Sequence, residues 1–392
     1  MNILMYRYGS ICEPDIIDTF HTFGFEVTEY DREIKEKADL PSTSVKKLAA
    51  FLQEHPVDCI FSINFFPFVA EVCQVMHLRY LSWIVDCPVM ELYAKSILSP
   101  YNRIFLFDRA LYDEIHPFNP DCVFHLPLAA NTLSKDKLFA HTAPSLHQKF
   151  AHPVAFVGSL YTEKSPYDRA TDIPPHTKGY LEGIMRAQEN VYGYYFIEEL
   201  LKEDMVEDFK SSIDGFYQFP AESFLTDKRT LAQLYIGNKI TAMERMDTFR
   251  LLSQNFPTYI YTGSDTSSLP DIHNMGFAKS LTEMPLIFHN SKININTTSK
   301  IIRTGLPLRI FDILSCGGFC LSNYQDEIPE HFVPGEDLVV YSSMDEMIAL
   351  CEYYLSHEGE RADIARSGYE KVKANYTYVH QLDRLMSTAF AF

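Results

Sequence analysis

Residues Ser291–Glu330 read SKININTTSKIIRTGLPLRIFDILSCGGFCLSNYQDEIPE. This run predicts a strand, a polar loop that contains Gly305, a helix from about Pro307, a stop at Gly317-Gly318 and a second strand. Proline suits the first helical turn because its missing N–H group would be unpaired there in any case. The two glycines permit a positive φ and a close backbone approach, which ends the helix.

The same alternation of strand and helix patterns extends through both halves of the chain. Strands that are apolar on both faces and separated by helices indicate parallel, doubly wound sheets. The length of 392 residues favours two such α/β domains. The expected strands are Asn2–Tyr8, Glu26–Tyr30, Asp58–Asn64, Tyr80–Val85, Arg103–Phe107, Cys122–Leu126, Val154–Val157, Thr258–Thr262, Lys292–Ile295, Phe319–Ser322 and Leu338–Tyr341.

A polar stretch from Asn131 to Pro153 interrupts this alternation and is the expected linker. It divides the chain into an N-terminal domain, 1–150, and a C-terminal domain, 151–375. Residues 161–230 show helical patterns without strands and are the expected helical insertion, with helices at Gly179–Asn190 and Tyr194–Phe209. A last helix at about 376–392 is expected to return to the first domain. Two similar domains that face one another would form a cleft at the carboxyl ends of both sheets.

The net negative charge of the chain argues against nucleic acid and anionic membranes as partners. The sequence has 34 basic and 52 acidic residues, a formal net charge of −18, so no broad positive surface is available for nucleic acid or an anionic bilayer. A nucleotide diphosphate remains compatible, because one or two arginines and a helix N-terminus suffice for a small anion. The cysteines are scattered and the N-terminus has a strand-like pattern, which predicts a cytoplasmic protein. No apolar run approaches the roughly 20 residues of a membrane span, so no integral membrane association is expected.

Two charged residues, Arg309 and Asp312, lie one turn apart on the expected helix. The helix start directs unpaired N–H groups and partial positive charge toward the loop at Gly305, where a phosphate or a sugar hydroxyl can be held. The Arg309 fork suits a diphosphate, and a carboxylate at Asp312 can accept both hydroxyls of a ribose. An ion pair that only supports the helix is an equal alternative.

The stretch resembles the C-terminal domain of CgeB-like glycosyltransferases, a spore-maturation-type family. The resemblance rests on Ser291–Asn296, Gly305–Phe319, Leu321–Tyr324, Phe332–Tyr341 and Asn375–Tyr378. Upstream, Ser82–Asp86, Phe105–Arg109, Leu126–Asn131 and Phe156–Leu160 resemble the same family's N-terminal domain and linker. The match covers most of the chain, and a combined pattern of this length is far more specific than a lone glycine motif.

The resemblance implies a GT-B fold, in which two Rossmann-like doubly wound domains face a cleft. It further implies a hexosyltransferase-type enzyme that binds a nucleotide-diphosphate sugar, with a UDP-sugar as first choice, in its C-terminal domain and the acceptor in its N-terminal domain. Asp312 matches the ribose-binding acid of related enzymes, and the backbone of Gly305 and Leu306 would contact donor phosphate or sugar. Asn296 and Thr304 complete the expected donor set. Thr304 stands where retaining relatives place a second acid, which leaves the stereochemical outcome open.

Three further positions follow expected strands. Gly158-Ser159 would contact the donor diphosphate, with an ordinary tight turn as the equal alternative; Lys164 is a weaker candidate for the same anion. Asp86 is the candidate catalytic base that deprotonates an acceptor hydroxyl, and a cap before Pro88 is the alternative. Gly9-Ser10 follows the first strand and would approach the acceptor.

We expect a reaction without a metal, because an arginine and helix N–H groups can offset the charge of the leaving diphosphate. No D-x-D motif lies in the expected loop, and Asp326-Glu327 is interpreted as a pair of solvated turn residues, with a position that lines the cleft as the alternative. Two alternatives stay open: a nucleotide-sugar epimerase or hydrolase on the same fold, and a non-catalytic sugar-nucleotide binding protein. The acceptor, whether protein, glycan or small molecule, is not identified by the sequence.

Overall fold

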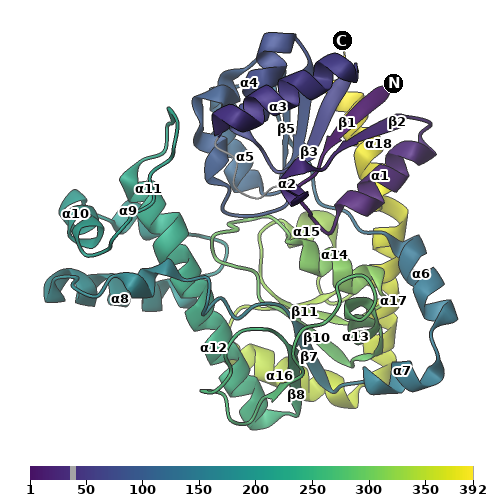
Figure 1. The fold of residues 1–392 in the computed structure, drawn as a ribbon. Helices are drawn as coiled ribbons and strands as arrows, with labels where there is room; N and C mark the ends of the chain where they lie inside the picture. Colours follow the sequence, from purple (N-terminus) through teal and green to yellow (C-terminus); the bar gives the residue numbers. More distant parts are fainter. Residues whose placement is uncertain (36–40, 392) are drawn as a thin grey trace. The chain divides into compact units, whose positions relative to one another are not determined.

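The computed structural model describes residues 1–35 and 41–391, which form two compact units. The first unit contains residues 1–129, 219–225 and 376–391, and the second contains 130–218 and 226–375. Figure 1 shows the elements of both units, coloured along the sequence. The first unit therefore ends about twenty residues before the predicted boundary at 150.

The displaced boundary has a local cause. Helices α6 (Thr132–His141) and α7 (Pro144–Lys149) occupy the predicted linker. The Tyr369 hydroxyl donates to Asp136 Oδ2 over 2.7 Å, and Lys135 Nζ donates to Ser315 Oγ over 2.8 Å. These tertiary contacts fasten α6 to the second unit, although its sequence is polar.

The sheet of the first unit is parallel throughout, with the strand order β2-β1-β3-β4-β5-β6. Helices α3 and α4 pack together, as do α1 and α18. The strands are β1 (Asn2–Tyr6), β2 (Glu26–Tyr30), β3 (Cys59–Ile63), β4 (Arg79–Trp83), β5 (Asn102–Leu106) and β6 (Val123–His125). The helices are α1 (Glu13–Thr22), α2 (Arg32–Lys35), α3 (Pro41–Glu54), α4 (Pro67–Met76), α5 (Arg109–Ile115) and α18 (Tyr378–Ala389), with short 3-10 turns at Met90–Tyr93, Lys95–Leu98 and His116–Phe118.

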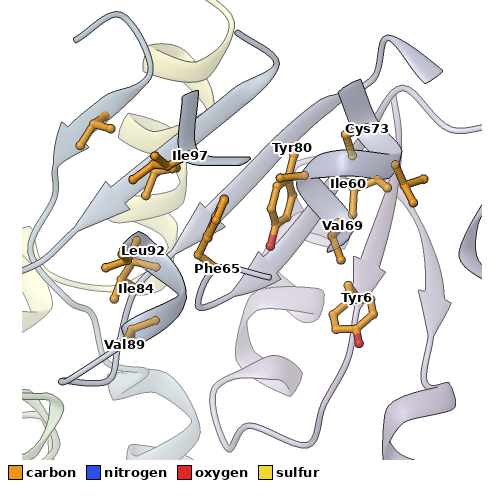
Figure 2. Close-up of a cluster of buried hydrophobic side chains, with 14 of the residues drawn as sticks. Tyr6, Ile60, Phe65, Val69, Cys73, Tyr80, Ile84, Val89, Leu92 and Ile97 are labelled. Carbon is orange, nitrogen blue, oxygen red and sulfur yellow. The ribbon is translucent and has the colours of Figure 1, made fainter. Parts of the chain in front are cut away.

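Alternate strand residues form the core of this unit. Side chains two positions apart point to the same face of a strand, so apolar strands supply a continuous buried layer. Figure 2 shows Tyr6, Ile60 and Tyr80, from β1, β3 and β4, beside Val69 and Cys73 of α4. All five are almost fully buried.

The sheet of the second unit is also parallel, with the strand order β12-β11-β10-β7-β8-β9. Within this sheet, β7 comes first in the sequence, and β8 and β9 follow on one side of it. The chain then crosses to the other side of β7, where it forms β10. The strands are β7 (Val154–Val157), β8 (Thr258–Tyr261), β9 (His273–Asn274), β10 (Ile293–Asn296), β11 (Cys320–Asn323) and β12 (Val339–Tyr341). The helices are α12 (Asn238–Asn255), α13 (Met284–Asn290), α14 (Leu308–Ser315), α15 (Ile328–His331), α16 (Met344–Ser356) and α17 (Glu358–Asn375).

The region 161–230 contains no strand, and every one of its residues is described. It holds a 3-10 turn at Pro166–Arg169 and the helices α8 (Pro175–Glu189), α9 (Ile197–Leu200), α10 (Glu203–Ser211) and α11 (Asp227–Thr230), drawn in teal in Figure 1. The single helix predicted at Tyr194–Phe209 is wrong, because α9 and α10 are separate. A π-helical turn, Leu231–Gly237, leads into α12. A core of its own, which includes Leu181, Phe209 and Tyr235, stabilises the region.

Candidate functional site

The carboxyl ends of β7 and β10 lie side by side at the point where the strand order of the second unit reverses. In doubly wound sheets, the loops that leave two such strands diverge and leave room for a ligand. Here the loops begin with Gly158-Ser159 after β7 and with Thr297 after β10. The residues that the sequence predicts for donor binding belong to the end of β10, to these loops and to helix α14.

The loop after β10 is held by buried polar side chains. Asn296 Nδ2 donates to Thr298 Oγ1 and to Ser322 Oγ, each over 2.9 Å. The Thr298 N–H donates to Asn323 Oδ1 over 2.7 Å. Both hydrogens of the Asn296 amide are therefore used within the protein, and the side chain positions the loop between β10 and β11.

The start of α14 differs from the prediction by one residue. Pro307 is the N-cap, with φ −68° and ψ 157°, and the helix begins at Leu308. Leu306 is buried, and the Gly305 carbonyl accepts a hydrogen bond from Gln325 Nε2 over 3.1 Å. The turn before the helix is therefore held against the loop that follows β11.

The carboxylate of Glu327 lies beside Thr304. The Thr304 hydroxyl donates to Glu327 Oε1 over 2.8 Å, and the Glu327 N–H donates to the Thr304 carbonyl over 3.1 Å. Glu327 is buried, so its interpretation as a solvated turn residue is wrong; Asp326 is exposed. Hydrogen bonding between two loops, which local patterns do not encode, buries it.

Arg309 and Asp312 form the intrahelical pair that the sequence left as one of two alternatives. Arg309 Nη1 lies 3.3 Å from Asp312 Oδ2 and 2.7 Å from Met284 Sδ, and its guanidinium lies over the Phe288 ring. Burial lowers the pKa of Arg309, and the Asp312 charge opposes that shift. Arg309 is thus packed against α13 while it stays in contact with the carboxylate.

A second cation, Lys135 of α6, was missed by the sequence analysis. Its Nζ lies 3.8 Å from Asp312 Oδ1. Both cation distances to Asp312 are longer than a good hydrogen bond, which is about 2.7–3.2 Å, so Asp312 keeps acceptor capacity for a ligand. No sequence signal marks Lys135, because it stands in a polar segment among other charges.

Gly158 and Ser159 form a tight turn after β7. Ser159 Oγ donates to Glu163 Oε1 over 2.7 Å and accepts the Tyr161 N–H over 2.8 Å. The Glu163 carboxylate also accepts the Ser264 hydroxyl over 2.7 Å. Lys164 Nζ lies over the Tyr161 ring, 4.8 Å from its centroid. The Ser159 hydroxyl is therefore used within the turn, as the alternative of an ordinary turn predicts. A ligand at this turn would contact its backbone.

Arg245 of α12 connects the two loops and was also missed. Its Nη1 donates to the Ser159 carbonyl, and its Nη2 donates to the Thr297 carbonyl over 2.8 Å. In sequence it is one charged residue within a helical pattern, typical of a solvated helix face. Only the strand order places it at the reversal point.

A buried ion pair fastens the helical insertion to the loop after β10. Lys300 Nζ lies 3.3 Å from Glu244 Oε1 and donates to the Val191 carbonyl over 3.2 Å, and it lies 3.2 Å from the centroid of the Tyr192 ring. Burial raises the pKa of Glu244 and lowers the pKa of Lys300, while the attraction between them opposes both shifts. The insertion therefore packs against the loop that follows β10.

The first unit has its own polar cluster at the carboxyl ends of β1, β3 and β4. Asn64 Nδ2 donates to Asp86 Oδ2 over 2.6 Å and to the Tyr8 hydroxyl over 3.0 Å. Asn64 Oδ1 accepts the N–H groups of Val85 and Asp86. Burial, followed by the Asp86 charge, raises the pKa of Tyr8. Asp86 lies three residues after β4, and Asn64 fixes its carboxylate.

The turn at Gly9-Ser10 serves an internal partner. The N–H groups of Tyr8, Gly9 and Ser10 donate to Glu13 Oε1 over 2.9, 3.0 and 3.1 Å. The Glu13 carboxylate is fully buried and also pairs with Arg7. These three N–H groups are therefore engaged by Glu13, and an acceptor at this turn would be contacted by other atoms.

Within residues 1–35 and 41–391, no group of three or more His, Cys, Asp or Glu side chains is arranged to hold a metal ion. In the same ranges, no helix combines the length and the apolar character needed to cross a bilayer.

Residues 240–387 match the model of a family described as "Glycosyl transferase-like". This segment contains most of α12 and all of β10 and α14, together with the loop after β10. It does not contain α6, the loop after β7 or the helical insertion. The chain has the GT-B glycosyltransferase fold. The fold confirms the predicted pair of doubly wound domains, and the match over residues 240–387 agrees with the predicted glycosyltransferase class.

Three solved structures illustrate the likeness. Anabaena HepE, solved with UDP-glucose, is 11% identical with a TM-score of 0.59, and both chains are covered fully. Sucrose-phosphate synthase from Thermosynechococcus elongatus is 10% identical with a TM-score of 0.57, over 100% of this chain and 99% of that one. A UDP-forming trehalose-phosphate synthase from Burkholderia xenovorans is 12% identical with a TM-score of 0.56, over 100% and 98%. No curated protein sequence matches the GT-B chain significantly.

Proposed function

We propose that the chain is a CgeB-like glycosyltransferase that transfers a hexose from a UDP-sugar to an acceptor hydroxyl. The observation that carries this proposal is the meeting of the loops after β7 and β10 within a glycosyltransferase-like domain, at the reversal of its strand order. The similar HepE structure was solved with UDP-glucose, which supports a UDP-sugar as the donor.

Asp312 is the proposed ribose ligand. Its carboxylate can accept two hydroxyl groups, and Arg309 and Lys135 supply positive charge on either oxygen. We assign Arg309 and Lys135 as positioning residues that orient the Asp312 carboxylate. The Gly305 and Leu306 backbone, with the N–H groups at the start of α14, is proposed to contact donor phosphate or sugar.

The proposed mechanism needs no divalent metal, because N–H groups and arginine side chains can stabilise the leaving diphosphate. Asp86 is the proposed base that takes the proton from the acceptor hydroxyl as the bond between that oxygen and the sugar forms. Asn64 would hold the Asp86 carboxylate in place for this step. The bond between the sugar and the diphosphate breaks in the same transfer, and UDP leaves.

The test is a screen of nucleotide sugars by thermal shift and calorimetry, followed by turnover assays with EDTA present. We expect one UDP-sugar to stabilise the protein, since a ligand at 100 times its Kd adds about 2.7 kcal/mol to the free energy of unfolding. UDP release should then require an acceptor drawn from protein, glycan and small-molecule panels.

Other outcomes would contradict the proposal in distinguishable ways. Formation of an epimer or of free sugar without an acceptor would identify an epimerase or a hydrolase. Tight binding without turnover across all acceptor panels would identify a non-catalytic binding protein. A failure of every nucleotide sugar to bind would reject the donor assignment itself.

A further inference from the structure

Arg245 combines burial with incomplete pairing. It lies on α12, is half-buried, and donates only to two backbone carbonyls, those of Ser159 and Thr297. Among the described residues, no carboxylate lies within ion-pair distance of its guanidinium; the neighbouring Glu244 is paired with Lys300. Carbonyl oxygens satisfy hydrogen bonds but leave the net positive charge uncompensated.

Donor capacity also remains on the same side chain. An arginine has five N–H hydrogens, and two are used here. The buried Arg245 Nε has no hydrogen-bond partner within the protein, and neither has the buried Thr297 Oγ1, on the residue whose carbonyl Arg245 binds. Arg245 and Thr297, which join the loops where the strand order reverses, thus each carry one polar atom without a hydrogen-bond partner.

Two aromatic rings fix the guanidinium. Its carbon lies 4.7 Å from the centroid of the Tyr161 ring and 5.5 Å from that of Phe156. Tyr161 is itself held in the left-handed region, with φ 65°. A cation held in a defined orientation loses little conformational freedom when it binds an anion, which favours affinity.

We propose that Arg245 binds the diphosphate of the nucleotide-sugar donor and of the product nucleotide. This inference rests on the proposed function and adds to it the residue that neutralises the leaving group. Ser159 and Thr297 are among the first residues after β7 and β10. The Arg245 guanidinium therefore lies beside the position that a diphosphate at the reversal point would occupy. The two carbonyl contacts join the loops, and the remaining N–H hydrogens are proposed to donate to the anion.

The experiment measures how much each phosphate adds to binding. Calorimetric affinities for UDP, UMP and uridine are compared in the full chain, in Arg245→Gln and Arg245→Lys, and in a matched control, Arg250→Gln. Arg250 lies on the same helix, is exposed and pairs with Asp247. Loss of charge-assisted hydrogen bonds should weaken UDP binding by about 10- to 100-fold in Arg245→Gln. Uridine binding should stay unchanged, Arg245→Lys should be intermediate, and the control should match wild type.

A structural role predicts a different result. If the Arg245 variants weaken uridine and UDP by the same factor, or leave the UDP-to-uridine ratio at its wild-type value, the assignment is overturned while the proposed function stands. If wild type does not prefer UDP to uridine, the proposed function fails and the assignment fails with it.

A second measurement needs no variant and applies if both substitutions prevent folding. Arginine modification by phenylglyoxal is followed by peptide mass spectrometry with UDP or uridine present, and Arg250 serves as the internal reference. We expect UDP, and not uridine, to slow the modification of Arg245 relative to Arg250. Equal rates with the two ligands would overturn the assignment.

Discussion

Asp312→Asn is expected to lower kcat/KM for the donor by at least about 100-fold. Two hydrogen bonds from ribose hydroxyls to a carboxylate are each worth about 1.5–3 kcal/mol, and an amide offers only one acceptor oxygen. The same change leaves Arg309 and Lys135 without their shared carboxylate. Steady-state kinetics measure the loss, and Asp345→Asn, an exposed substitution in the first turn of α16, is the matched control.

A ligand comparison separates ribose binding from general damage. Wild type should bind UDP more tightly than 2′-deoxy-UDP, because the deoxy nucleotide lacks one hydroxyl for Asp312. In Asp312→Asn that preference should fall toward one. A preference for UDP that persists in the variant would show that Asp312 does not contact the ribose, whatever its effect on kcat.

Lys300→Met is expected to lower the free energy of unfolding by about 3–5 kcal/mol, because it leaves the Glu244 charge buried without its partner. Urea unfolding measures this change. The double variant Lys300→Met/Glu244→Leu removes both charges and should recover most of the loss. If the single variant loses less than about 1 kcal/mol, the pair is not the fastening of the insertion described above.

The loss should depend on pH in a defined direction. Burial raises the pKa of Glu244, and Lys300 opposes that shift, so removal of Lys300 raises the pKa further. A carboxyl whose pKa is higher in the folded state favours folding when protonated, and this contribution disappears as pH rises. Lys300→Met should therefore be least destabilised near the ordinary glutamate pKa of about 4.3 and more destabilised at pH 7.

The sequence predicted the two parallel sheets because their signals are local. Buried parallel strands give short apolar runs. The glycines Gly317-Gly318 mark the end of α14, and the structure shows why a side chain does not fit at Gly318. A Cβ on Gly318 would lie 2.5 Å from the Phe288 carbonyl. The start of α14 was placed one residue early because proline suits both the cap and the first turn. The domain boundary was misplaced because single side chains, such as Asp136 with Tyr369, attach α6 to the second unit.

Much of the candidate site was beyond local sequence patterns. Arg245, Lys135 and Lys300 are isolated charges in helical or polar segments, and such residues are usually solvated. Topology alone brings Arg245 to the reversal of strand order, and burial alone distinguishes Glu327 from its exposed neighbour Asp326. By contrast, Asp312 was predicted as a ligand because it belongs to a long combined pattern with fixed spacing.

We propose that UDP is held by the loops after β7 and β10 and by the turn before α14. Hydrogen exchange of the full chain, with and without saturating UDP, tests this claim most directly, because bound loops open less often. We predict slower exchange in peptides that cover 158–162 and 297–308. Slower exchange confined to the first unit, around Tyr8, Asn64 and Asp86, would show that UDP does not bind at these loops.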